Sequence, residues 1–187
     1  DSETSKLNID KALEIYEEQN DKDGIGRAYI EYANHYWKKN DLETAVEYDK
    51  KSLALYEELG DLEGVAINLC GIGIYYSDIL KDYEGALAKY ERAQNIFEEN
   101  GYKRHMPYSL NNMVSIELKT GNYSSAINHL NKLSRVVKEL GYGDKVEQGQ
   151  LDVISSVHTS MGNYKTAIMG LEQGLKVYEN INDRKMI

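Results

Sequence analysis

The strongest constraint on the fold of this 187-residue chain is a turn sequence that recurs four times at nearly constant spacing. The four turns cover 40–45, 81–86, 121–126 and 162–167, and the alanines that end them are 41, 40 and 41 residues apart. A second set of positions keeps intervals of 40, 41, 40 and 41: Tyr16, Tyr56, Phe97, Val137 and Tyr178. Self-similarity with this period is typical of repeat proteins, in which similar units stack and bury their apolar faces against one another.

Each repeat has the pattern of two amphipathic helices joined by the recurring turn. In the first repeat the helical spacing involves Tyr29, Tyr32, Ala33 and Tyr36 before the turn, and Ala45, Tyr48, Ser52, Leu53 and Tyr56 after it. Residues suited to a helix N-cap stand at Asp41, Asp82, Asn122 and Asn163, and C-terminal glycines at Gly60, Gly101 and Gly141. The small residues that end the turns predict where the two helices of a repeat approach most closely: Ala45, Ala86, Ala126 and Ala167.

These residues resemble the tetratricopeptide repeat (TPR) family. That family has large or aromatic, large and small positions before its turn, then an alanine and a large residue four positions later. The period here exceeds the family's usual 34 residues and is similar to the 40-residue variant of kinesin light chains and bacterial signalling proteins. The resemblance implies an all-α solenoid of about nine helices, with antiparallel helix pairs forming a right-handed superhelix.

The repeat pattern predicts a single TPR-type array across 1–187. Residues 5–20 align with the trailing helix of a preceding repeat, and 182–187 with the start of a truncated next one. The helix pairs between them are predicted at 24–60, 64–101, 105–141 and 145–181. Because both ends align with incomplete repeats, we expect a fragment of a larger protein, with homodimerisation through exposed terminal helices as one expectation.

Composition excludes several classes of function. The net charge of −9 disfavours nucleic acid as a partner, and no apolar run reaches the length that would predict a membrane span. The single cysteine cannot form an internal disulfide and favours a reducing compartment. We therefore expect a cytoplasmic protein, with a periplasmic or extracytoplasmic sensor as the alternative location.

The residues that could support catalysis, metal or cofactor binding have structural explanations. Asp152, Ser155 and His158 have helical spacing, but a continuous helix uses the backbone N–H groups that an oxyanion hole requires. The histidines stand in different repeats, so they predict no metal site. Gly24-Ile25-Gly26 and Gly71-Ile72-Gly73 lack the third glycine of a dinucleotide fingerprint. The sequence thus predicts no enzyme, no metal and no cofactor.

The family resemblance implies a binding groove along the first helix of each repeat. Transferred by repeat position, the residues lining it are Arg27, Ile30, Asn34, Trp37, Lys38, Ile67, Cys70, Ile74, Tyr108, Asn111, Asn112, Ser115, Lys119, Asp152 and Ser156. Asparagine amides can bond both N–H and C=O of a bound peptide backbone, and Trp37, Ile67 and Ile74 would form an apolar anchor. The alternative is that all of these are solvent-facing residues of a scaffold.

The leading hypothesis is a non-catalytic protein- or peptide-binding scaffold or sensor module of a larger bacterial signalling or regulatory protein. The alternative is a receptor for a peptide or small ligand that controls an attached output domain, such as a kinase, cyclase or transcription regulator. Paired glutamates recur near the ends of the second helices, at 17–18, 57–58 and 98–99. They fit either a solvated outer ridge or a docking strip for a basic partner.

Overall fold

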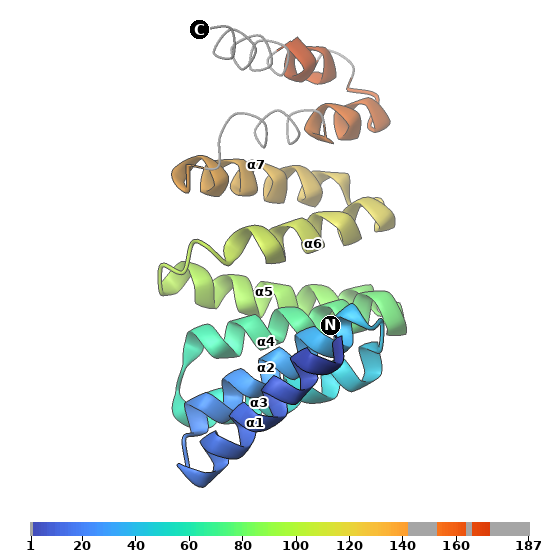
Figure 1. Ribbon diagram of the computed structural model, residues 1–187. Coiled ribbons are helices and arrows are strands. Elements are labelled where there is room, and N and C mark those ends of the chain that lie inside the picture. Colours follow the sequence, from blue (N-terminus) through green and yellow to red (C-terminus); the bar gives the residue numbers. More distant parts are fainter. Residues whose placement is uncertain (1, 142–152, 164–165, 173–187) are drawn as a thin grey trace, which may run out of the picture. The chain divides into compact units, whose positions relative to one another are not determined.

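The computed structural model describes residues 2–141, 153–163 and 166–172 (Figure 1). Within these ranges the secondary structure consists of helices joined by short turns, which confirms the all-α prediction. The chain forms two compact units, Asp1–Tyr102 and Lys103–Ile187.

The first unit is a succession of helices in which each helix packs against the next (Figure 1). It contains α1 (Ser2–Glu18), α2 (Lys22–Lys38), α3 (Leu42–Leu59), α4 (Leu62–Tyr75), the π-helix η1 (Tyr76–Leu80) and α5 (Tyr83–Glu99). The pairs α2–α3 and α4–α5 are the first two predicted repeats. The alanines predicted at their closest approach, Ala45 and Ala86, are both completely buried.

Aspartate side chains cap α2, α3, α4 and α5 of this unit. Asp21, Asp41 and Asp82 accept a hydrogen bond from the backbone N–H three residues later, at 3.0, 3.2 and 2.9 Å. Asp61 accepts two, from Glu63 and Gly64. These bonds satisfy N–H groups that have no partner within the first helical turn.

The π-helix η1 accommodates one extra residue in the second repeat. At the end of α2, the N–H of Asp41 bonds to the carbonyl of Tyr36, five residues earlier. At the end of η1, the N–H of Asp82 bonds to the carbonyl of Tyr76, six residues earlier. Since π-helices commonly absorb single insertions, the wider turn lets the next helix begin with an unchanged aspartate cap.

The second unit begins with α6 (Met106–Thr120) and α7 (Tyr123–Glu139), followed by described helical residues at 153–160 and 166–172. Val114, Leu130 and Val157 form a core cluster that joins α6 and α7 to the helical segment at 153–160. Ala126 and Ala167 are buried, as predicted. The unit therefore continues the helix-pair arrangement with its own core.

Helices α6 and α7 of the second unit begin without a side-chain cap, which contradicts the cap predicted at Asn122. Tyr102 stands where the second repeat has Asp61, and α6 begins only at Met106, next to Pro107. Asn122 stands at the N-cap of α7 but does not cap it with its side chain. Its amide donates instead to the Thr120 hydroxyl, at 3.2 Å.

Candidate functional site

The predicted groove residues of α2 form a mixed polar and apolar strip along one side of the helix. Ile30 and Trp37 are half-buried, whereas Arg27, Asn34 and Lys38 are exposed. The Arg27 guanidinium forms an ion pair with Asp23, one turn earlier on the same helix. This strip offers apolar surface and exposed polar groups to a ligand.

The corresponding residues of α4 differ in their accessibility. Ile67 and Ile74 are half-buried, but Cys70 is only 3% exposed. Burial raises the pKa of the Cys70 thiol to about 12, so the sulfur stays protonated at neutral pH. Cys70 therefore packs in the core between helices and does not present its side chain as groove surface.

Helix α3 holds α2 and α4 together beneath these two strips. The Tyr56 ring fills the space where a Cβ would stand on Gly26 of α2 and on Gly64 of α4. One turn earlier, Ser52 donates to the carbonyl of Gly26 at 3.0 Å, and the Asn68 amide of α4 donates to the Ser52 hydroxyl at 3.1 Å. The groove residues of α2 and α4 thus project from helices that share one packing partner.

Asp49 continues this contact surface of α3 and was not predicted as a site residue. It is 6% exposed, and the Trp37 side chain of α2 forms a hydrogen bond with its carboxyl group. On the α4 side, its Oδ2 lies 2.3 Å from where a Cβ of Gly71 would stand. The signal in the sequence is a charged residue where the other repeats have Tyr90, Leu130 and Leu171.

In the second unit the predicted asparagines bond to their own helix. The Asn111 amide donates to the carbonyl of Pro107 at 2.8 Å, and that of Asn112 to the carbonyl of Tyr108 at 3.0 Å. A side-chain amide has two N–H donors and a carbonyl oxygen, so each asparagine can keep this bond and still bond to a peptide backbone. The predicted residues Tyr108, Ser115, Lys119 and Ser156 are exposed, and Asp152 lies outside the described residues.

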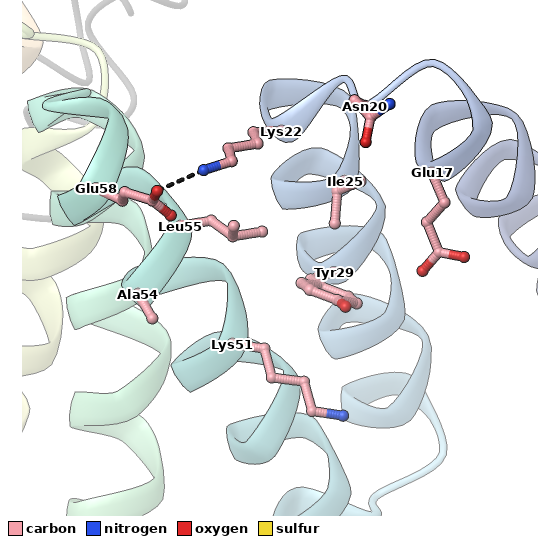
Figure 2. A pocket seen from close by; sticks show the side chains of 9 residues that line it. All are labelled: Glu17, Asn20, Lys22, Ile25, Tyr29, Lys51, Ala54, Leu55 and Glu58. Carbon is pink, nitrogen blue, oxygen red and sulfur yellow. Dashed lines mark hydrogen bonds and ion pairs between the residues drawn. The ribbon is translucent and has the colours of Figure 1, made fainter.

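A cleft of about 500 Å³ opens on the other side of α2 (Figure 2). Ile25 and Tyr29 of α2 lie between the end of α1 and the facing side of α3. The residues lining it are Glu17, Asn20, Lys22, Ile25, Tyr29, Lys51, Ala54, Leu55 and Glu58. None of them belongs to the predicted groove, so α2 carries two candidate binding surfaces on different sides.

The charged residues that line this cleft are two glutamates and two lysines. Lys22 and Glu58 form an ion pair at one end (Figure 2). Lys51 lies over two aromatic rings, with its Nζ 5.9 Å from the Tyr29 centroid and 4.8 Å from that of Tyr48. The cleft therefore combines an apolar floor with one amine that is available to an anionic group.

Several of the recurring glutamates form ion pairs between helices. Glu57 of α3 bonds to Arg92 of α5 at 2.9 Å. In the second unit, Glu139 of α7 forms an ion pair with Lys103 at 2.5 Å. Glu139 and Lys103 occupy the same repeat positions as Glu58 and Lys22, which form the ion pair at the cleft. Glu57 and Glu58 are thus engaged within the protein, which for this pair favours the solvated-ridge interpretation over a docking strip.

The residues that suggested catalysis do not form a site in the described part of the chain. Ser155 is 2% exposed in a helix, and His158 is half-buried on the same helix. Within the described ranges no three histidine, cysteine or acidic residues cluster in a way that could hold a metal ion. The described helices also include none that is both long and apolar enough to cross a membrane.

Successive helix pairs with surface strips on their first helices define a helical-repeat protein of the solenoid type. Residues 24–99, which span α2 to α5, match the family model for the tetratricopeptide repeat. These helix pairs are tetratricopeptide repeats, which confirms the resemblance seen in the sequence. No curated protein matches the chain.

Similar solved structures have the same fold at low sequence identity. BtubC (BKLC) from P. vanneervenii is 17% identical with a TM-score of 0.75, covering 94% of this chain and 75% of that one. A Podosopora anserina protein described as a candidate kinesin light chain with nearly identical TPR-like repeats is 13% identical with a TM-score of 0.72, covering 97% and 88%. A Rap protein complexed with Competence and Sporulation Factor is 15% identical with a TM-score of 0.63, covering 97% and 61%.

Proposed function

We propose that this chain is a non-catalytic module that binds a protein or peptide segment along the groove side of its first helices. The observation that carries the proposal is the strip of half-buried apolar side chains on α2 and α4: Ile30, Trp37, Ile67 and Ile74. Partly exposed apolar groups next to polar ones are typical of the surfaces that bind peptides. Exposed Asn34 adds an amide that can bond to a peptide backbone.

The comparisons support binding as the general role and signalling as the setting. One similar fold is that of a Rap protein solved with Competence and Sporulation Factor, and another is aspartyl phosphate phosphatase F from Bacillus subtilis. We propose that this chain serves as the scaffold or sensor module of a bacterial signalling or regulatory protein.

The cleft supports a second function of another class, the reception of a small ligand. Its volume of about 500 Å³ falls within the range of small-molecule sites, and Lys51 would bind a carboxylate or phosphate group. In that case the ligand would occupy the opposite side of α2 from the groove, and would control an output domain attached to the repeats.

One experiment separates the two surfaces. A random-peptide display library is selected on the wild-type chain, and the affinity of the enriched peptides is measured for two matched variants. Ile67→Gln/Ile74→Gln alters the groove side, whereas Ile25→Gln/Leu55→Gln alters the cleft. All four side chains are half-buried isoleucines or leucines.

We expect the groove variant to bind at least about tenfold more weakly, because apolar anchors carry much of the affinity, while the cleft variant binds as the wild type does. The reverse result would favour the cleft as the binding site. A selection that enriches no peptide would overturn the proposal of a peptide-binding groove.

A further inference from the structure

The contact surface of α3 differs in character from its counterparts in the following repeats. Along α3 it consists of Asp49, Ser52 and Tyr56. The same positions are Tyr90, Ala93 and Phe97 on α5, and Leu130, Leu133 and Val137 on α7, all of which are buried. The fold therefore does not require a charged residue at the position of Asp49.

The surroundings of Asp49 do not compensate for the burial of its carboxyl group. Burial raises the pKa of Asp49 to about 7, although the hydrogen bond from Trp37 acts in the opposite direction. Its Oδ2 is buried and has no hydrogen-bond partner. None of the ion pairs among the described residues includes Asp49, and the ionisable group next to it on α4 is the protonated thiol of Cys70.

The unpartnered oxygen lies in the contact between α3 and the two groove helices of the first unit, α2 and α4. Trp37 of α2 interacts with the carboxyl group, and so does Cys70 of α4. Gly71 of α4 is half-buried and has no side chain, and the carboxyl group occupies the space that a Cβ there would fill. A side chain there would displace the carboxyl group, because even a Cβ would stand 2.3 Å from Oδ2.

We propose that Asp49 binds a basic side chain, arginine or lysine, of a peptide that lies along α2 and α4. This inference rests on the peptide-binding function proposed above and names the chemistry of its ligand. A guanidinium or ammonium group supplies the hydrogen-bond donor that Oδ2 lacks and a positive charge that compensates for its burial. The indole of Trp37 adds a ring over which a cation can lie. Ile67 and Ile74 accommodate the apolar neighbours of that residue.

The proposed contact predicts how binding depends on pH. A basic side chain binds the ionised carboxylate, so binding should strengthen as the pH rises from about 6 to about 8. The groups that face Asp49 from its packed helices are the Trp37 indole, which does not titrate, and the Cys70 thiol, which stays protonated in this range. Asp49 is thus the titrating group at this position.

The test uses the peptides that the display library enriches on the wild-type chain. We expect arginine or lysine at one fixed position of these peptides. A synthetic peptide is then compared with its neutral isostere, in which citrulline replaces arginine or acetyl-lysine replaces lysine. Binding is followed by the fluorescence of Trp37, the single tryptophan of the chain.

For the wild type, we expect the neutral isostere to bind at least about tenfold more weakly than the basic peptide. For Asp49→Asn, the affinities of the two peptides should differ by less than about twofold. Glu43→Gln, which removes an exposed carboxylate of the same helix, is the matched control and should keep the wild-type ratio. Thermal unfolding checks that Asp49→Asn is folded. This inference would be overturned if the enriched peptides showed no preference for a basic residue, or if the neutral isostere lost as much affinity for Asp49→Asn as for the wild type. Neither result would contradict the proposed peptide-binding groove. A library without any enriched peptide would overturn both proposals.

Discussion

Among the described residues, Asp49 of the first unit and Glu117 of the second are the buried carboxyl groups, and they differ in their hydrogen-bond partners. Glu117 of α6 is 3% exposed and receives a hydrogen bond from Ser125 at 2.6 Å. Nδ1 of His129 lies 2.9 Å from both of its carboxylate oxygens. Asp49 of α3 is similarly buried, yet its Oδ2 has no partner.

The two carboxyl groups differ in whether the packing of their repeat accounts for them. Glu117 stands at the repeat position where the first repeat has Tyr36, whose ring stacks on Tyr48 at 5.7 Å. His129 stands at the position of Tyr48, so a contact between an imidazole and a carboxyl group replaces a pair of stacked rings between the two helices. Glu117 is explained by this packing, whereas Asp49 remains unexplained until a ligand is considered.

The largest effect on stability is expected when Glu117 loses a hydrogen-bond partner, so that it becomes incompletely partnered as Asp49 is. His129→Ala removes one donor and leaves the buried carboxylate with Ser125 alone. The lost hydrogen bond to a buried carboxyl group and the lost packing together should lower the free energy of unfolding by about 3–5 kcal/mol, measured by urea denaturation followed by circular dichroism. The control is Glu117→Gln combined with His129→Ala, which should recover part of the loss. Equal stability of the single and double variants would contradict the hydrogen-bond explanation.

A smaller effect is expected from neutralising Asp49, and it should depend on pH. Because burial raises the pKa of this carboxyl group from 3.8 to about 7, its contribution to stability is complete below pH 4 and is lost as the pH rises to about 7. Asp49→Asn should therefore be more stable than the wild type by about 2–4 kcal/mol at pH 8. The difference should shrink as the pH is lowered and disappear near pH 4. Thermal unfolding between pH 4 and 8 measures it, and a pH-independent difference would show that Asp49 does not titrate there.

The smallest effect is expected where the two units are alike. Lys22–Glu58 and Lys103–Glu139 are exposed ion pairs at the same repeat position. Exposed pairs contribute little because water and salt screen them, so Lys22→Met and Lys103→Met should each change the melting temperature by less than about 2 °C. The changes should vanish in 1 M salt. A large shift for one variant alone would mean that the two pairs are not equivalent.

Periodic features of the fold could be predicted because one physical cause repeats in each unit. Ala45, Ala86 and Ala126 are buried where the helices approach, and the aspartates cap the helices of the first unit. Asn122 was predicted to cap α7 from its repeat position, but its amide donates to the Thr120 hydroxyl instead.

The candidate site was harder to predict because burial depends on neighbours that are distant in sequence. Cys70 has a groove position in the repeat, yet the packing of α4 buries it. The cleft needs three helices to form, so no pattern within one repeat indicates it. Asp49 was visible as a departure from the other repeats, but its unpartnered oxygen depends on Gly71 and Trp37 in space.

The π-helix η1 has a consequence for how such arrays can change during evolution. One residue inserted into an α-helix turns all following side chains by about 100° around the axis, which would redirect every contact. Here Tyr76 still packs on α5, with Lys89 Nζ 5.7 Å from its ring centroid, although the extra residue follows it directly. A wide turn at the end of a helix therefore confines an insertion to a few residues. Repeats of 40 and 41 residues can then alternate within one chain, and single-residue insertions become accessible to selection without loss of the fold.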